Sequence, residues 1–493
     1  MSSSAANSGS SGDLKLLLGG EWRESESEDK RDFFDPASGS VIGRVPFSTK
    51  EEANLAVESA GRAFESWKAL PITDRAKFLF KLKDVLEANA EELAMLNTRN
   101  HGKTLEESRG DVRRTVENVD VAISIAHTLA RGTLLDQISP GIDEEMVKEP
   151  LGVFAIICPF NFPVMIPFWF LPYAIVLGDT VVVKPSEITP LPMQRVASLI
   201  QDQVKLPAGV FNLVHGGSEV VESLIANEST KGVTFVGSSP VARKVYRLAG
   251  EHGKRAIANG GAKNSIVVMP DAEIDLAIPS MISSFFGNSG QRCLAGANLL
   301  LVGEAKERVL GKFADAASRL KIGPGVKPDT QMGPVVSAAA KERILKYVQY
   351  GLDEGAYILK DGRTAKVAEF PGGFYLGATV FEGVAPDMKI AKDEIFGPVA
   401  SILDVEDLDS AINMINRGTD FGNMASIFTS SGRAAREFRR GIRAGNIGIN
   451  IGVAAPSANF PFGGMKGSFF GVLHAQIDTV DFFTDRKTTI TRW

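Results

Sequence analysis

The residue of this chain best suited to chemistry is Cys293, one of only two cysteines. Small residues (287–290) precede it, and an apolar, strand-like run (297–302) follows. Small residues leave room for a substrate beside the thiol, and they let backbone N–H groups approach it. The adjacent Arg292 carries positive charge that favours the thiolate, the form of cysteine that attacks carbonyl carbons. A buried structural cysteine would have the same local sequence, so the other motifs must decide between the two.

Polar residues at the ends of predicted strands supply two such motifs. Asn161 lies in CPFNFP (158–163), directly after a predicted strand, where ligands bind in open parallel sheets. Its amide can donate a hydrogen bond to a developing oxyanion. Lys184 ends the strand-like run VVVK, and Glu187 follows three residues later. A lysine and a carboxylate together can bind ribose hydroxyls, although an exposed lysine at a strand end is the commoner case.

Three glycine-containing loops complete the set. Residues 235–250 form a predicted strand, a Gly237-Ser238 turn and a helix, whose N-terminus can bind a phosphate. This turn is not a GxGxxG motif, and alone it is weak evidence for nucleotide binding. Packing alone does not explain the Gly/Pro loops EIFGPV (394–399) and PFGGMKGS (461–468).

The elements that carry these motifs alternate between strand and helix. From residue 151 the runs GVFAIICP, TVVVKPS, VFNLVHGG and GVTFVGS are separated by helical stretches, which predicts βαβ units and a parallel sheet. A second series follows residue 262, with NSIVVM, ANLLLVGE, VASILDV and MASIFTS. We therefore expect two α/β units that abut near residue 260. Residues 49–129 are helical by periodicity, and the irregular, acidic segment 133–149 leaves the main body.

Composition excludes several classes of function. The 493 residues include 54 basic and 59 acidic ones, for a formal net charge of −5, with no basic block suited to nucleic acid. Two cysteines cannot build a disulfide framework, and the His and Cys residues lack metal-ligand spacing. The most apolar stretch, 164–178, is short for a membrane span and contains two prolines. We expect a cytoplasmic protein whose Ser/Gly-rich start is a disordered tail.

Taken together and in order, the motifs FNFP, KPSE, FVGS, GNSGQRC, EIFGPV and PFGGMKGS resemble those of the NAD(P)-dependent aldehyde dehydrogenase superfamily. The resemblance runs from about residue 14 to the C-terminus. It implies an aldehyde dehydrogenase fold, α/β, with two abutting Rossmann-like parallel-sheet domains and a small oligomerisation arm. It also implies Cys293 as the nucleophile, Asn161 as an oxyanion donor, and seven residues that bind NAD: Phe160, Lys184, Glu187, Gly237, Ser238, Glu394 and Phe396.

The same resemblance implies how the chain divides. Residues 1–13 would be the tail, 14–130 with 150–259 the NAD-binding domain, and 260–475 the catalytic domain. Residues 131–149 and 476–493 would form the arm, which crosses to a neighbouring subunit in a homodimer or homotetramer. One departure is Ala242, which stands where the family's phosphate-binding turn has a second glycine.

A second departure concerns release of the product. Hydrolytic members carry a glutamate in E-L-G-G-K that activates water, whereas the matching stretch here begins with Asn259. An amide cannot take a proton from water. The substitution, together with HGKTLEESRGDV (101–112) and TDRKTTITRW (484–493), resembles the methylmalonate-semialdehyde dehydrogenases, which pass the acyl group to coenzyme A.

This resemblance implies NAD-dependent oxidation of (methyl)malonate semialdehyde to propionyl-CoA or acetyl-CoA with loss of CO2. Arg114 and Arg292 would bind the substrate carboxylate; the alternative for Arg114 is a solvated arginine on the face of a helix. Glu187 favours NAD over NADP, since a carboxylate repels a 2′-phosphate. Two alternatives stay open: a hydrolysing dehydrogenase of another aldehyde, and a catalytically silent relative. Retention of Cys293, Asn161 and Lys184 argues against the second.

Overall fold

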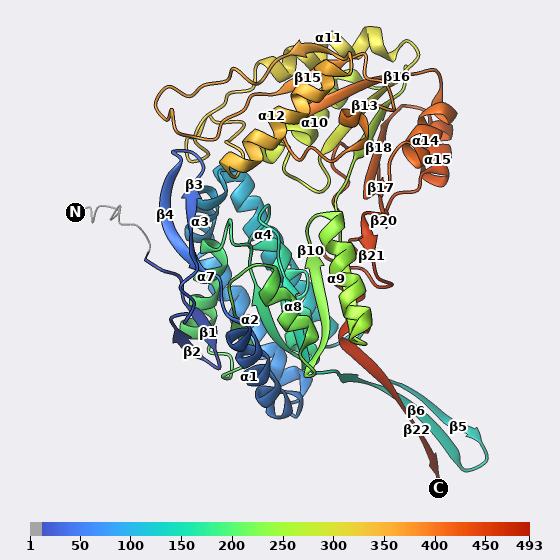
Figure 1. The fold of residues 1–493 in the computed structure, drawn as a ribbon. Coiled ribbons are helices and arrows are strands. Elements are labelled where there is room, and N and C mark those ends of the chain that lie inside the picture. Colours follow the sequence, from blue (N-terminus) through green and yellow to red (C-terminus); the bar gives the residue numbers. More distant parts are fainter. Residues whose placement is uncertain (1–11) are drawn as a thin grey trace.

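A computed structural model of the chain describes residues 12–493. Residues 1–11 of the expected tail lie outside this range, whereas the carboxylate of Asp13 pairs with Lys30 and Arg44. Two large sheets organise the described residues, one in each half of the molecule, with helices packed around both (Figure 1). The chain thus has the two α/β units that the alternating pattern predicts.

The first sheet lies in the lower half of Figure 1. Its strands are β1 (Leu16–Leu18), β2 (Glu21–Arg23), β7 (Val153–Ile157), β8 (Thr180–Lys184), β9 (Phe211–Leu213), β10 (Thr230–Val236), β11 (Arg255–Asn259) and β21 (Phe469–Phe470). They run in the order β2-β1-β9-β8-β7-β10-β11-β21, and the five strands from β9 to β11 are parallel. β7 and β8 are buried on both faces, which is why they are almost wholly apolar.

The second sheet lies in the upper half. Its strands are β12 (Asn264–Val268), β13 (Gly296–Val302), β14 (Tyr357–Lys360), β15 (Thr379–Glu382), β16 (Val399–Val405), β18 (Met424–Phe428) and β19 (Asn446–Ile449). They run in the order β14-β15-β16-β13-β12-β18-β19, parallel except for β14. The first sheet therefore ends at β11 and the second begins at β12, close to the expected boundary, but β21 of the expected catalytic segment joins the first sheet.

Helices cover these sheets. Those of the first unit are α1 (Lys50–Lys68), α2 (Ile72–Ala88), α3 (Ala90–His101), α4 (Leu105–Ile125), α5 (Met165–Phe168), α6 (Leu171–Leu177), α7 (Leu191–Leu199), α8 (Ser218–Ala226), α9 (Ser239–Glu251) and α16 (Thr479–Phe483). Those of the second are α10 (Ile274–Phe286), α11 (Ala305–Ser318), α12 (Ala338–Asp353), α13 (Lys389–Lys392), α14 (Leu408–Arg417) and α15 (Gly432–Gly441). One hydrophobic cluster includes residues from α2, α4 and α6 as well as α10 and α11, so the two units share a core.

Capping explains where α4 begins. The Thr104 hydroxyl accepts the N–H of Glu107 (3.3 Å), and the Glu107 carboxylate accepts the N–H of Thr104 (3.0 Å). This reciprocal pair satisfies two N–H groups that the first turn of a helix leaves free. α3 ends at Gly102, whose φ of 95° is in the left-handed region that favours glycine. The α3–α4 turn therefore has a defined shape.

The arm is a three-stranded antiparallel sheet of β5 (Thr133–Ser139), β6 (Ile142–Pro150) and β22 (Thr484–Arg492), which projects from the body (Figure 1). The expected arm segment 476–493 divides in two. Its first part forms α16, whose Phe483 packs on Phe154 of β7 with ring centroids 4.6 Å apart. Only residues from Thr484 onward project.

Two small antiparallel pairs complete the fold: the hairpin of β3 (Lys30–Asp35) with β4 (Ser40–Pro46), and the non-sequential pair of β17 (Phe421–Gly422) with β20 (Met465–Lys466). Within residues 12–493, no helix is both long enough and apolar enough to cross a membrane. Nor do three or more His, Cys, Asp or Glu side chains of this range gather as a metal ion would require.

Candidate active site

A cavity of about 1080 Å³ opens beside the carboxyl ends of β7, β8 and β10 and reaches the loop that carries Cys293. Nine of the eleven residues expected to form the site line it: Phe160, Asn161, Lys184, Glu187, Gly237, Ser238, Cys293, Glu394 and Phe396. Arg114 and Arg292 do not line it. The structure therefore brings to one cavity the residues that were expected to act as the nucleophile, the oxyanion donor and the NAD-binding groups.

The loop before Cys293 has an unusual backbone. Asn288 and Ser289 have φ angles of 52° and 53°, which non-glycine residues adopt at a cost of about 1 kcal/mol or more each. Two contacts hold them there: the Asn288 N–H donates to Glu107 Oε1 (2.5 Å), and Ser289 Oγ donates to the Gly333 carbonyl (2.7 Å). Gly290 packs so closely on the Gly397 carbonyl that a Cβ would overlap with it. The small residues thus serve close backbone packing as well as space for a ligand.

Asn161 is buried, at 4% exposure, and faces this loop. Its Nδ2 donates one N–H to the Gln291 carbonyl (3.1 Å), and no other residue among 12–493 accepts the second. The backbone carbonyl of Asn161 accepts from Lys103 Nζ (2.7 Å) and from Asn288 Nδ2 (3.4 Å). Asn161 is therefore held through both its side chain and its backbone carbonyl, while the second N–H of its side-chain amide could donate to an oxyanion.

Cys293 is half-buried, and its surroundings favour the thiol. Burial raises the pKa of Cys293 to about 12, and the nearby Glu394 carboxylate adds to the increase. The backbone N–H groups of Cys293 and Leu294, and the Arg292 guanidinium, lower this pKa but do not offset burial. Arg292 thus lowers the pKa of Cys293, as expected, but by less than burial raises it. Its Nη2 is paired with Glu107 Oε1 (2.8 Å).

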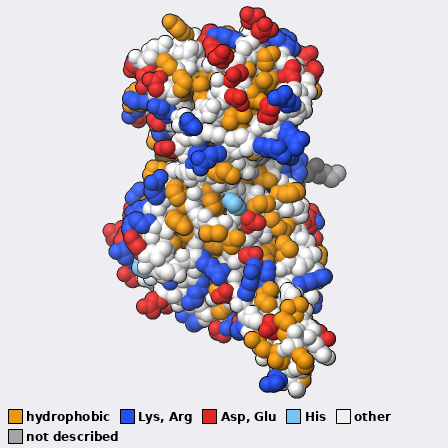
Figure 2. All heavy atoms as spheres, turned by 90° about the vertical axis from the view of Figure 1, so that its right-hand side faces the viewer, with side chains coloured by type: hydrophobic (Ala, Val, Ile, Leu, Met, Phe, Trp, Pro, Cys, Tyr) orange, Lys and Arg blue, Asp and Glu red, His pale blue; other side chains and the backbone are white. Residues whose placement is uncertain are grey.

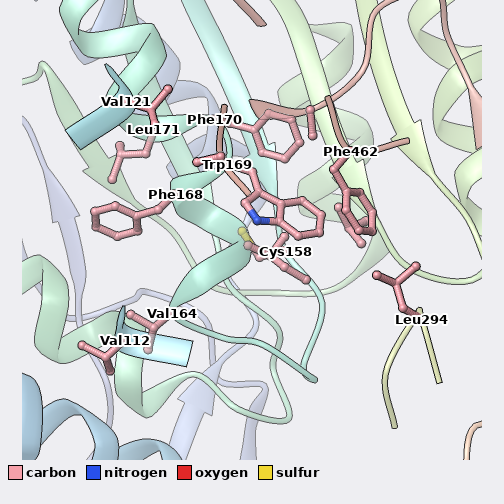
Figure 3. Packing of buried hydrophobic residues seen from close by; sticks show 14 of the residues in the cluster. Val112, Val121, Cys158, Val164, Phe168, Trp169, Phe170, Leu171, Leu294 and Phe462 are labelled. Atoms are coloured by element: carbon pink, nitrogen blue, oxygen red, sulfur yellow. The ribbon is translucent and has the colours of Figure 1, made fainter. Parts of the chain in front are cut away.

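The other cysteine is structural in its surroundings. Cys158 is buried, its Sγ donates to the Ile156 carbonyl (3.7 Å), and burial raises the pKa of its thiol far above the ordinary value. Figure 3 shows it in the apolar cluster of Trp169, Phe462 and Leu294, where the Trp169 and Phe462 rings are 4.3 Å apart. Cys158 also lines the cavity, but a thiol whose pKa is raised this far is a poor nucleophile near neutrality.

The nucleotide-facing end of the cavity has the expected polar groups. Lys184 Nζ pairs with Glu187 Oε2 (3.2 Å) and donates to the Gly216 carbonyl (2.8 Å), so a donor and an acceptor stand together. Ser238 precedes α9, and its side chain makes no capping hydrogen bond, which leaves the positive end of this 13-residue helix facing the cavity. These features fit a dinucleotide with a pyrophosphate at α9 and a ribose at Lys184 and Glu187.

Glu394 lines the same cavity, and its carboxylate is close enough to Cys293 to raise the pKa of the thiol. Its Oε1 accepts the N–H of Ala262 (2.8 Å), yet burial raises the pKa of the Glu394 carboxyl to about 7. Burial lowers the pKa of Lys263, a neighbouring buried lysine with no hydrogen-bond partner among the described residues. Phe396 has a φ of 53° and packs edge-on against Phe160, with ring centroids 5.7 Å apart.

Asn259 is the last residue of β11, between Val236 of β10 and Phe469 of β21. It is buried, and its Nδ2 has no hydrogen-bond partner within residues 12–493. The next two residues, Gly260 and Gly261, line the cavity. An amide rather than a carboxylate therefore stands at the edge of the site.

The two arginines expected to bind a carboxylate are each paired with a glutamate. Arg114 Nη1 lies 2.6 Å from Glu117 Oε2 in a half-buried pair on α4, and Arg292 pairs with Glu107. Both pairs join the two units of the fold. Arg292 belongs to the second unit and pairs with Glu107 of the first, and Glu117 Oε1 also accepts the N–H of Ala458. Each guanidinium therefore already has a glutamate partner, with which a substrate carboxylate would have to share it.

Residues that the sequence pattern does not single out also support the site. Lys103 and Glu107 contact the loops of Asn161 and Cys293, and Gln291 supplies the carbonyl that Asn161 binds. The segment HGKTLEE that holds Lys103 and Glu107 matches the family, but a lysine before a capped helix is ordinarily solvated. Only its burial, at 1% exposure, distinguishes Lys103.

Comparison with known proteins gives the family. The aldehyde dehydrogenase family model matches residues 22–489, so the chain belongs to the aldehyde dehydrogenase family. A malonate-semialdehyde dehydrogenase of Geobacillus kaustophilus (strain HTA426) is 44% identical over 481 residues, which are 97% of this chain and 99% of that protein.

Two solved structures are similar over 98% of this chain, each with a TM-score of 0.95. One is a methylmalonate-semialdehyde dehydrogenase from Oceanimonas doudoroffii, at 38% identity and with 99% of its chain covered. The other is a proposed methylmalonate-semialdehyde dehydrogenase from Sinorhizobium meliloti 1021 complexed with NAD, at 37% identity and with 98% covered. The aldehyde dehydrogenase fold expected from the motifs is therefore confirmed.

The pKa of Cys293 gives the first prediction. Because this pKa is raised to about 12, the thiolate is a minor species near neutrality and grows with pH. Alkylation of the free enzyme by iodoacetamide should accelerate roughly tenfold per pH unit from about pH 6 to 9. Cys158→Ser should leave this rate unchanged, and Cys293→Ala should abolish labelling in peptide mass spectrometry. A plateau below pH 9 would contradict the buried-thiol state.

Proposed function

We propose that the chain oxidises (methyl)malonate semialdehyde with NAD and transfers the acyl group to coenzyme A, with loss of CO2. The observation that carries the proposal is Asn259, an amide beside a cavity that otherwise has the parts of an aldehyde dehydrogenase. The names of the relatives favour the same substrate. The product would be acetyl-CoA from malonate semialdehyde and propionyl-CoA from its methyl derivative.

The first chemical step belongs to Cys293. Its sulfur attacks the aldehyde carbon, and the resulting oxyanion accepts hydrogen bonds from Asn161 Nδ2 and the Cys293 N–H. Preorganised donors of this kind are worth about 10²–10³-fold in rate each. The hemithioacetal carbon then loses a hydride and becomes a thioester on Cys293.

NAD, when bound, supplies the nicotinamide ring that accepts this hydride. Lys184 and Glu187 would hold its adenosine ribose, with Gly237 and Ser238 at the pyrophosphate. Glu394, Phe396 and Phe160 would hold the nicotinamide end. Glu187 favours NAD over NADP because its carboxylate opposes a 2′-phosphate.

Loss of CO2 follows from the position of the substrate carboxylate. In the thioacyl enzyme that carboxylate is β to the thioester carbonyl, so breaking its C–C bond leaves an enolate rather than a free carbanion. The enolate oxygen occupies the position of the earlier oxyanion, where Asn161 donates to it. Protonation at carbon then gives the acetyl or propionyl thioester.

The step that releases the acyl group from Cys293 distinguishes this reaction from hydrolysis. A thiol with a pKa of about 8.5 is partly ionised near neutrality, so coenzyme A can displace the acyl group without a strong base. Water needs a base, and the Asn259 amide cannot be one. The alternative, a hydrolysing dehydrogenase, is favoured by one observation: Glu394 lines the cavity with a pKa raised to about 7, within the range of a general base.

The exposed arm bears on the oligomeric state that we propose. The exposed arm carries apolar side chains such as Leu134 and Ile490, at 62% and 66% exposure, and a three-stranded ribbon exposed on both faces needs a partner. Figure 2 shows further apolar side chains on the face that carries α9 and β21. We propose a homodimer or homotetramer in the reducing cytoplasm, where both free cysteines are stable.

Asn259→Glu tests the proposed role of the amide. Beyond the first turnover, wild type should form NADH from the semialdehyde only with coenzyme A, whereas Asn259→Glu should release free acid without it. General-base assistance is worth about 10²–10⁴-fold, enough to see in a single-turnover quench of the thioacyl enzyme. Asn259→Gln, which keeps an amide at the glutamate's length, is the matched control and should gain nothing. If wild type turns over equally fast without coenzyme A, the hydrolytic alternative is correct.

Substitutions of the two arginines test substrate recognition. Arg114→Leu and Arg292→Leu should each raise KM for the carboxylated aldehyde far more than for propanal. A lost charged hydrogen bond costs about 2–3 kcal/mol, or roughly 30- to 150-fold. Arg113, the exposed neighbour of Arg114, provides the control Arg113→Leu, which should change neither value. Equal losses on both aldehydes would assign the arginines to the ion pairs with Glu107 and Glu117 alone.

Deletion of residues 488–493 tests assembly. The deletion removes most of β22, so the arm loses an edge and the oligomer should dissociate or aggregate in light scattering. Arg433→Ala, on α15 and away from the arm in Figure 1, is the control and should keep the native mass. An unchanged oligomer after the deletion would refute the role of the arm.

A further inference from the structure

The α3–α4 turn holds a lysine in an unusual place. The Lys103 side chain is wholly buried, and all three protons of its ammonium have a partner. Nζ lies 2.7 Å from the Asn161 carbonyl, 3.1 Å from Asp111 Oδ2, and 4.2 Å from the centroid of the Phe162 ring. Burial of a charge is costly, and here one of its three contacts is the backbone of the oxyanion donor.

Asp111 anchors this ammonium. Besides Lys103, its carboxylate accepts the N–H of Met165 (2.7 Å) and the amide of Asn97 (2.8 Å), so it is fixed by α3 and α5. Asp111 stabilises the charged form of Lys103 against the effect of burial. The ammonium therefore has a rigid support on one side and Asn161 on the other.

Two hydrogen bonds flank Asn161 in its loop: Thr189 Oγ1 donates to the Phe160 carbonyl (3.0 Å), and the Ile166 N–H donates to the Phe162 carbonyl (3.2 Å). The hydrogen bonds of Asn161 itself are those with Lys103, Asn288 and Gln291. The loop leaves β7 between Pro159 and Pro163, outside the ladder of the sheet. Without Lys103, the Asn161 carbonyl would keep only Asn288 Nδ2 at 3.4 Å. The amide of the same residue bonds to Gln291, two residues before Cys293. A rotation of this peptide would therefore move the amide relative to the sulfur.

We propose that Lys103 is a positioning residue of the active site, whose buried ammonium fixes the Asn161 peptide and thereby aims the Asn161 amide at the oxyanion formed on Cys293. The proposal rests on the proposed role of Asn161 as oxyanion donor. Lys103 touches neither substrate nor cofactor in this role. It acts through Asn161 alone, which makes its effect separable from stability and from the reactivity of the thiol.

An activated ester tests this without NAD or coenzyme A. The Cys293 thiolate attacks the carbonyl of p-nitrophenyl acetate, an oxyanion forms, and the C–O bond breaks to give p-nitrophenolate and acetylated Cys293. The burst of p-nitrophenolate thus measures the nucleophile and its oxyanion donor. Iodoacetamide alkylation measures the thiolate without any oxyanion, because it displaces iodide at a saturated carbon.

Lys103→Met, which keeps length without charge, should slow the burst about 10- to 100-fold, and Asn161→Ala about 10²-fold or more. The double variant should be no more than about threefold slower than Asn161→Ala, since residues that act as a unit are non-additive. Alkylation should stay within about twofold of wild type in all three. Lys81→Met, on the exposed face of α2, is the matched control and should be unchanged throughout.

A second variant guards against a failure to fold. Lys103→Met with Asp111→Asn removes both charges, and the Asn97 amide can turn its unpartnered Oδ1 toward the new amide. This variant should melt cooperatively and show the same slow burst. Additive losses in the Asn161 double variant, slowed alkylation, or a normal burst in either Lys103 variant would overturn the proposal. A normal burst in Asn161→Ala would instead show that the oxyanion assignment itself is wrong.

Discussion

The site depends on one contact between the two halves of the molecule, the hydrogen bond from Asn161 Nδ2 to the Gln291 carbonyl. Asn161 follows β7 of the first sheet, and Gln291 belongs to the loop that enters β13 of the second. A nucleophile and its oxyanion donor must be held to within about 0.5 Å, and neither sheet can do this alone. The shared core of the two units supplies that rigidity at a distance, and the α3–α4 turn supplies it locally.

The residues that support the site locally carry backbone strain and a buried charge, both of which cost folding free energy. Two left-handed residues precede Cys293, and a lysine is wholly buried behind Asn161. Each would destabilise the fold if it stood alone, but hydrogen bonds to Glu107, to the Gly333 carbonyl and to Asp111 hold Asn288, Ser289 and Lys103 in turn. Strain and buried charge concentrated around one pair of residues are what a preorganised site requires.

Much of this could be predicted from the sequence. The apolar runs of β7 and β8 indicate buried parallel strands, and the ordered motifs place nine residues around one cavity. Lys103 could not be recognised, because a lysine's burial depends on side chains far away in sequence. The raised pKa of Cys293 could not be predicted for the same reason: burial and the Glu394 carboxylate, which is distant in sequence, outweigh the adjacent Arg292. The sequence motifs therefore predict which residues form the site better than they predict the pKa values of those residues.

The central claim is that the acyl group waits on Cys293 for coenzyme A because Asn259 cannot activate water. Intact-protein mass spectrometry tests it most directly. Enzyme mixed with the semialdehyde and NAD, then quenched without coenzyme A, should carry the added mass of one acetyl or propionyl group. Digestion and peptide mapping should place that mass on the peptide of Cys293. Addition of coenzyme A before the quench should remove that mass and yield the acyl-CoA. Unmodified enzyme with free acid in solution, formed without coenzyme A, would contradict the account.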